Sequence, residues 1–217
     1  MPQTQPHAEV PPGSLWIVSA PSGGGKTSLS RALVERLKQR GIACAISVSY
    51  TTRAPRAGEE HGSHYHFVDD ATFLAMVAAG EFLEHAEVFG RRYGTGLAET
   101  ERLLAAGTEL LLDIDWQGAR QIRARRPDAK GVFILPPSAA ELERRLHGRG
   151  QDDPEVIAAR MEAAHAEMVH YDEYDYLIVN DTFDHALDEL QSLILARRLG
   201  LPAQRARHAA LIRELKL

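Results

Sequence analysis

The sequence predicts an α/β protein built on a parallel sheet with helices on both faces. Short apolar runs of strand length alternate with segments of helical periodicity along most of the 217 residues, a pattern typical of that architecture. The first apolar run leads into a glycine-rich loop and then a helix, the setting of a phosphate-binding loop. Residues 50–96 break the alternation because they are polar and rich in glycine and histidine, and we expect them to form an inserted α/β subdomain.

The order of the elements follows from local signals. The apolar run 15–19 is a strand, and Leu29, Leu33 and Leu37 then follow in four-residue steps, which indicates a helix over 27–40 that Gly41 ends. A later helix over 154–171 is expected to be capped at residue 153 and to begin with proline. The further strands are expected at 44–49, 109–113, 131–135 and 175–180, and the further helices at 70–79, 97–106, 116–125, 139–147 and 183–199.

These elements divide the chain into segments. Residues 1–13 are expected to be a disordered lead-in, and residues 14–199 to form one domain whose core is 14–49, 97–137 and 173–199. The insert is 50–96, and 138–172 is a largely helical segment. Residues 200–217 are expected to form an amphipathic helix with Leu211, Ile212 and Leu215 on one side. That side could pack on the core or on another subunit, so a homo-oligomer is possible.

Composition limits the cellular setting. The net charge of −5 argues against binding to nucleic acid or to an anionic membrane surface. No apolar run has membrane-spanning length, and the first residues lack the basic start of a signal peptide. Cys44 is the only cysteine, so no internal disulfide is possible and a reducing compartment fits. We expect a cytoplasmic protein with no nucleic-acid or membrane partner.

Residues 20–28 have the composition of a loop that holds the phosphates of a nucleoside triphosphate. The three glycines at 23–25 let backbone N–H groups face an anion, and the helix that follows adds its positive end. Lys26 would reach the outer phosphates, and the Thr27 hydroxyl would bind Mg²⁺. A flexible glycine turn is the alternative, and Ala20 stands where the usual pattern has glycine. The expected binding residues are Ala20, Pro21, Ser22, Gly23, Gly24, Gly25, Lys26, Thr27 and Ser28.

Two further groups of side chains suit a phosphate and a metal. Arg53 and Arg56 lie three residues apart in the insert, with Tyr65 further on, and such a set suits a phosphate monoester. Two arginines in a polar loop are, taken alone, more often ordinary surface charges. Asp113 and Asp115 follow a buried strand on the same side, where a phosphate-loop enzyme orders Mg²⁺ and its waters; a strand-end cap is the alternative.

Together these motifs resemble the guanylate kinase family. Residues 51–67 match the signature Thr-Thr-Arg-x-x-Arg-x-x-Glu-x-x-Gly-x-x-Tyr-x-Phe. The family's other segments stand in the same order, as APSGGGKTS, FLEHAEVFG, YGT, LDIDWQGA, FILPPS, RRLHGRG and YDYLIVND, so the similarity covers roughly residues 14–199. Bacterial members commonly have alanine at the position of Ala20.

The resemblance implies a P-loop NTPase core, a GMP-binding subdomain over 50–96 and a lid over 138–172. It implies transfer of the γ-phosphoryl group of ATP to GMP, or to dGMP, with Mg²⁺ accompanying ATP and no tightly bound organic cofactor. The residues implied for GMP are Ser49, Arg53, Arg56, Tyr65, Glu84, Tyr93, Thr95, Asp113 and Asp115. Those implied for catalysis are Lys26, Arg53, Arg145, Arg149 and Arg160; Asn180 would lie by the adenine, and Thr27 and Asp113 would hold the metal, mainly through waters.

Chemistry supports two of these roles. Guanine presents N1–H and a 2-amino group side by side, which the carboxylate of Glu84 can accept together, whereas adenine offers a bare acceptor there. Arg145 and Arg149 lie four residues apart at a helix end and so share a face. Closure of a lid that carries them, with Arg160, would bring positive charge to the phosphates and exclude water. Without the resemblance, each of these side chains would be an ordinary surface charge.

Two other functions stay open at this point. One is a nucleoside monophosphate kinase with another acceptor, although Glu84, Ser49 and Thr95 argue for guanine. The other is a non-catalytic guanylate-kinase-like module that binds peptides, although such modules typically have a degraded phosphate loop. The histidines at 61, 64 and 66 look like a metal cluster, but they stand in the signature segment, where no metal is expected.

Overall fold

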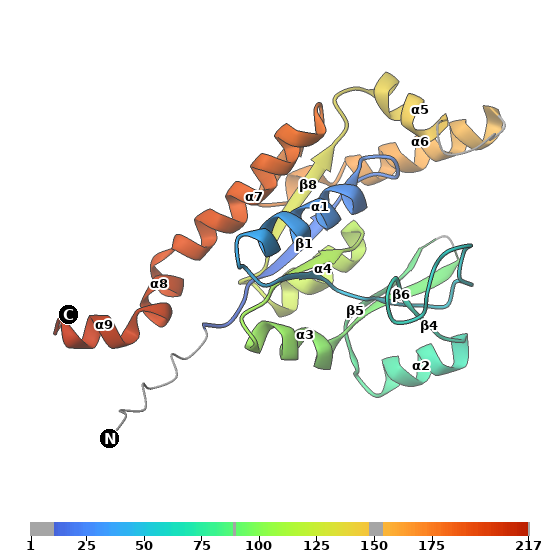
Figure 1. Cartoon of the computed structure of the whole chain (residues 1–217). Helices are drawn as coiled ribbons and strands as arrows, with labels where there is room; N and C mark the ends of the chain where they lie inside the picture. Colours follow the sequence, from blue (N-terminus) through green and yellow to red (C-terminus); the bar gives the residue numbers. More distant parts are fainter. Residues whose placement is uncertain (1–10, 89, 148–153, 217) are drawn as a thin grey trace.

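The structure of the chain, a computed structural model, describes residues 11–88, 90–147 and 154–216. Its centre is a five-stranded sheet in which all paired strands are parallel (Figure 1). In spatial order the strands are β2 (Cys44–Ile46), β7 (Glu109–Asp113), β1 (Leu15–Ser19), β8 (Lys130–Leu135) and β9 (Tyr176–Val179). The predicted α/β class and parallel sheet are confirmed.

Helices cover both faces of this sheet. On one face lie α1 (Lys26–Gln39) and α7 (Phe183–Leu199), and on the other lie α3 (Leu97–Ala105) and α4 (Trp116–Arg125). Successive strand residues point to opposite faces, so Trp16 and Val18 of β1 pack in the cluster with α1 and α7, whereas Leu15 and Ile17 pack in the cluster with α3 and α4. Every residue of β1 is buried, which fixes the loop that follows it.

Residues 50–96 form a second sheet beside the first. Its order is β4 (His66–Phe67), β3 (Tyr50–Thr51), β6 (Arg91–Gly96) and β5 (Phe82–Val88). Helix α2 (Asp70–Ala78) lies between β4 and β5 in the chain, and the Asp69 carboxylate caps it by accepting from the Thr72 N–H at 2.7 Å. Leu83 of β5 belongs to the cluster of α3 and α4, so one edge of the second sheet is packed into the core.

Helices α5 (Ala139–His147) and α6 (Pro154–Met168) form a pair of their own. Leu142 and Leu146 of α5 are buried against Ile157 and Ala164 of α6, in a cluster separate from those of the central sheet. Figure 1 shows this pair at one end of the molecule, with α8 (Leu201–Arg207) and α9 (Ala209–Glu214) at the other.

Two elements end three residues earlier than predicted. The strand expected over 44–49 ends at Ile46, because the chain then crosses to the second sheet, where the Ser49 carbonyl accepts from the His66 N–H at 2.9 Å. The helix expected over 154–171 ends at Met168 and is followed by the 3₁₀-helix η1 (Tyr171–Glu173). His170 stacks on Trp116 of α4 at 3.9 Å between ring centroids, and this contact turns the chain away from the helix axis.

The C-terminal segment also differs from its prediction. Instead of one amphipathic helix it forms α8 and α9, which are separated at His208. The Gln204 amide donates to the Arg198 carbonyl at 2.8 Å and so ties α8 to the last turn of α7. Leu211 and Leu215 are 51% and 58% exposed, so they do not pack on the core. No helix within the described ranges is long and apolar enough to cross a membrane.

Candidate active site

The glycine loop between β1 and α1 has the backbone of a phosphate cradle. Gly23 and Gly25 have φ angles of 89° and 95°, a region that residues with a Cβ rarely adopt. A Cβ on Gly25 would also lie 2.4 Å from the Asn180 amide nitrogen. Ala20 is not among the described residues with positive φ, so its Cβ is tolerated where the usual pattern has glycine.

The loop is joined to the end of β7. The Lys26 ammonium donates to the Ile114 carbonyl at 3.3 Å, and the same carbonyl accepts from the buried Ser19 hydroxyl at 2.8 Å. The Ser30 hydroxyl donates to the Asp113 carboxylate at 2.7 Å and fixes its orientation. The sequence analysis did not identify Ser30; its spacing of one helical turn from Lys26 was the available signal.

A carboxylate from α6 lies against the same loop. Glu167 accepts from the Ser22 N–H at 3.1 Å, and Lys26 is near enough to affect its charge. Burial raises the pKa of Glu167, while Lys26 opposes that shift. The sequence analysis did not identify Glu167, and no local motif marks it, because only the packing of α6 brings it to the loop.

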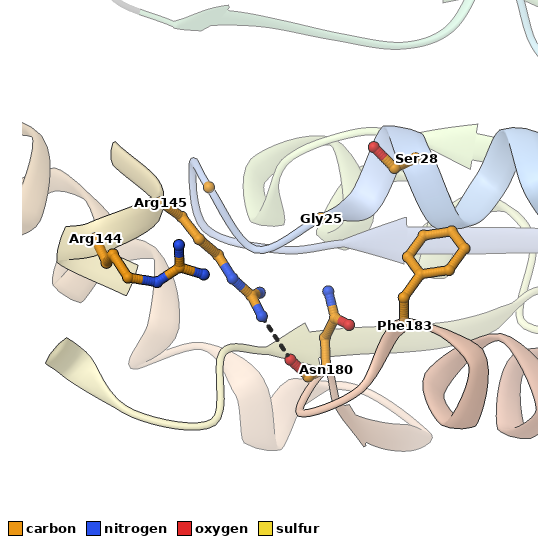
Figure 2. Close-up of a pocket in the computed structure, with 7 residues that line it drawn as sticks. Gly25, Ser28, Arg144, Arg145, Asn180 and Phe183 are labelled. Atoms are coloured by element: carbon orange, nitrogen blue, oxygen red, sulfur yellow. Dashed lines mark hydrogen bonds between the residues drawn. The ribbon is translucent and has the colours of Figure 1, made fainter. Parts of the chain in front are cut away.

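A pocket of about 350 Å³ lies beside the loop. Figure 2 shows Arg145 reaching from α5 toward Asn180; its guanidinium donates to the Asn180 carbonyl at 3.0 Å, and the Asn180 amide donates to the Gly24 carbonyl at 2.9 Å. Burial leaves Nη1 of Arg145 without a hydrogen-bond partner among the described atoms. The lining residues are Gly23, Gly25, Ser28, Arg144, Arg145, Asn180 and Phe183.

Of the three arginines predicted for the lid, the structure shows one at the pocket. Arg145 reaches the phosphate-loop side of the pocket, as described above, and its Nε atom also donates to the Glu141 carboxylate at 2.8 Å. Arg160 is half-buried on α6. Arg149 lies outside the described residues.

The Arg53 side chain is held in place by its neighbours. Its guanidinium donates to the Glu59 carboxylate at 2.8 Å and lies over the Tyr65 ring, 5.4 Å from the centroid. Hydrogen bonding to Arg53 lowers the pKa of Glu59 to about 2, so this carboxylate stays charged. Glu59 also accepts from the Arg56 N–H at 2.7 Å, and the exposed Arg56 side chain extends from that turn. The Tyr93 ring lies 6.1 Å from that of Tyr65.

Glu84 lies at the bottom of the site. Its side chain is 3% exposed and accepts from the Thr95 hydroxyl at 2.6 Å. Burial, with a smaller contribution from the negative charge of Asp115, raises the pKa of Glu84 to about 7. Asp115 caps α4 by accepting from the Gly118 N–H at 2.9 Å. Ser49 is half-buried where the chain enters β3.

The predicted residues therefore come from several elements that meet where β1 and β7 end. The phosphate loop and Asp113 belong to the central sheet, whereas Arg53, Tyr65 and Glu84 belong to the second sheet or its loops. Burial, more than the negative charge of Asp113, raises the pKa of Tyr65.

The oxygen atoms of Thr27 and Asp113 fit a hard cation. Mg²⁺ prefers oxygen ligands and keeps several waters, and it is usually bound by one or two carboxylates together with substrate phosphates. Among the described residues, no group of three or more His, Cys, Asp or Glu side chains could hold a metal by itself. This finding applies also to His61, His64 and His66. A metal that arrives with the nucleotide suits this donor set.

Comparison with known proteins agrees with this arrangement. Residues 13–197 match the family model described as guanylate kinase. The chain is 58% identical to the guanylate kinase of Salmonella typhimurium (strain LT2) and 57% identical to that of Escherichia coli (strain K12); each alignment covers 94% of this chain and 97% of the relative.

A solved structure has the same fold. The crystal structure of guanylate kinase from Anaplasma phagocytophilum superposes with a TM-score of 0.72 at 34% identity, covering 91% of this chain and 90% of that one. The family match over most of the chain and the curated relatives of high identity agree with this fold. The chain belongs to the guanylate kinase family.

Proposed function

We propose that the chain transfers the γ-phosphoryl group of ATP to GMP, giving ADP and GDP, at the space between the phosphate loop and Arg53. Its family supports an ATP:GMP phosphotransferase. The observation that carries the choice of acceptor is the buried carboxylate of Glu84, held by Thr95. As a carboxylate it can accept from both N1–H and the 2-amino group of guanine.

The reaction requires little covalent chemistry from the protein. An oxygen of the GMP phosphate attacks the γ-phosphorus, and the bond from that phosphorus to the oxygen of the β-phosphate breaks. Positioning and positive charge supply most of the catalysis. Lys26 and the loop N–H groups would hold the ATP phosphates, Arg53, Arg56, Tyr65 and Tyr93 would hold the acceptor phosphate, and Arg145, Arg149 and Arg160 would neutralise the group in transfer.

The remaining assignments support the same reaction. Thr27 and Asp113 would hold Mg²⁺, mainly through waters, and the bound ion would supply positive charge to the phosphates. Asn180, on the pocket beside the loop, would lie by the adenine; Ser49, Thr95 and Asp115 would surround the guanine. A cytoplasmic location and a role in purine nucleotide metabolism and GMP recycling belong to the same proposal, and dGMP stays open as a second acceptor.

The test is ADP release from ATP and Mg²⁺ with GMP, AMP, CMP or UMP as acceptor. We expect release with GMP alone. For Lys26→Ala we expect kcat to fall at least about a hundredfold, because the substitution removes a positive charge that would stabilise the transferred phosphoryl group. Lys38→Ala is the matched control, because Lys38 is exposed near the other end of α1. Release with another monophosphate would overturn the acceptor, and no release with any would favour a binding module.

A further inference from the structure

Helix α4 replaces the missing strand neighbour of β5. Strand β5 is at the edge of the second sheet, with β6 on one side. On its other side the Gln121 amide donates to the His85 carbonyl at 2.7 Å and accepts from the His85 N–H at 3.2 Å. The Arg125 guanidinium donates to the carbonyls of Phe82 and Leu83 at 3.0 and 2.7 Å. These bonds hold the β5 backbone at a fixed distance from the helix.

Gly118 lies on the same face of α4. Positions 118, 121 and 125 are spaced by three and four residues and therefore line one side of a helix. A Cβ on Gly118 would lie 2.7 Å from Oε2 and 3.2 Å from Cδ of Glu84. Such an approach is too close for a carbon and an oxygen that are not bonded, so a side chain at this position requires the Glu84 carboxyl group to move.

Glu84 has little room for that movement. Gln121 and Arg125 prevent the strand from backing away, and the carboxyl group is 3% exposed and bound to the Thr95 hydroxyl. It can respond only by rotating about its own bonds and giving up the Thr95 contact. The direction in which the carboxylate points is thus set by the absence of a side chain on α4.

We propose that Gly118 is a specificity-determining position of the acceptor site, because it leaves the space that aims Glu84 at the base. The inference rests on the proposed function, in which Glu84 reads guanine. Gly118 makes no contact with the substrate in this account; it is a positioning residue that acts through Glu84.

The test is Gly118→Ala in the full chain. Alanine favours a helix over glycine by about 1 kcal/mol, so a change in helix propensity alone would raise the midpoint of thermal unfolding. We expect the KM for GMP to rise at least tenfold and the ratio of kcat/KM for GMP to that for AMP to fall, with the KM for ATP unchanged. Ala124→Ser, at an exposed position of the same helix, is the control and is expected to leave these values unchanged.

A double-mutant cycle shows whether the effect passes through Glu84. In Glu84→Ala the contact that a Cβ on Gly118 would make with the carboxyl group is gone. Adding Gly118→Ala should therefore not raise the KM for GMP further, and the midpoint of thermal unfolding should rise as helix propensity predicts. If Gly118→Ala by itself fails to fold, the double variant should fold, because the clash is removed. Penalties that add in the double variant, or a double variant that stays unfolded, would overturn the inference.

The same cycle separates this inference from the proposed function. If Glu84→Ala retains the preference for GMP, the role of Glu84 itself is wrong. If Glu84→Ala loses that preference and Gly118→Ala retains it, the proposed function stands and the inference about Gly118 is wrong.

Discussion

The carboxyl group of Glu84 combines deep burial with a direct hydrogen bond from Thr95. Its pKa of about 7, raised by burial from 4.5, means that folding makes this group harder to ionise. In the unfolded chain the proton leaves near pH 4.5, whereas in the folded chain it stays until about pH 7. Between these values the folded state binds more protons, so rising pH favours unfolding.

This difference predicts a pH-dependent gain in stability for Glu84→Gln. Below pH 4.5 both side chains are neutral, and the difference in the free energy of unfolding between variant and wild type should be at its baseline. That difference should shift in favour of the variant by up to about 3 kcal/mol as the pH rises to 8, after which it should be flat. Urea unfolding of both proteins at pH 4.5, 6, 7 and 8 measures it; a pH-independent difference would contradict the raised pKa.

The sequence shows which residue types stand at the ends of the predicted strands. It does not show which helix face packs against which strand. Lys26 could be named from its place in the glycine loop and Asp113 from the end of a buried strand, whereas Arg53 was named through the resemblance of residues 51–67 to a family signature. Ser30 and Gly118 could not, because their importance depends on which helix face meets which strand. A glycine inside a helix carries no such information in the sequence, and for Ser30 the one available signal was its spacing of one helical turn from Lys26.

At the level of elements, α6 connects the phosphate loop to the segment expected to form the lid. Its last turn places Glu167 on the Ser22 N–H, and the next residues continue to His170, which stacks on Trp116 of α4. The sequence predicted the helix but placed its end three residues too late, because contacts with α4 decide that end. Because Glu167 contacts the phosphate loop, the phosphates of a nucleotide bound there would lie near its negative charge.

We therefore expect Glu167→Gln to bind ADP more tightly. Glutamine keeps the size and the acceptor oxygen but removes the charge, and a partly screened repulsion of about 1 kcal/mol corresponds to a roughly fivefold lower Kd. Calorimetric titration with ADP measures this change. Glu162→Gln is the matched control, because Glu162 is exposed on the same helix; equal or weaker ADP binding by Glu167→Gln would show that the contact does not oppose the nucleotide.

At the scale of the whole molecule, the hydrophobic clusters divide the structure more clearly than the sequence did. The pair α5–α6 has its own cluster, whereas the second sheet contributes Leu83 to the core. The sequence indicated an insert and a helical segment from changes in composition. It could not show how firmly each is attached, because attachment depends on contacts between residues far apart in the chain.

We predict that the molecule becomes more compact when both nucleotides bind. Lid arginines are useful only near the phosphates, and a pair of helices with a separate cluster can move without disrupting the core. Small-angle scattering should show a smaller radius of gyration with GMP and a non-hydrolysable ATP analogue together than with either alone. An unchanged radius would mean that the site is already closed.

The attachment of Leu83 to the core has a consequence for the order of events. Glu84 is the next residue and is itself buried, so the group proposed to recognise the base is attached directly to the core. Arg53 lies in the loop after β3, and Arg145 belongs to the α5–α6 pair with its own cluster. A monophosphate would thus meet a carboxylate anchored to the core before closure of the α5–α6 pair brings Arg145 to its phosphate. A monophosphate with the wrong base would dissociate before the catalytic arginines are in place, so no phosphoryl group of ATP would be transferred.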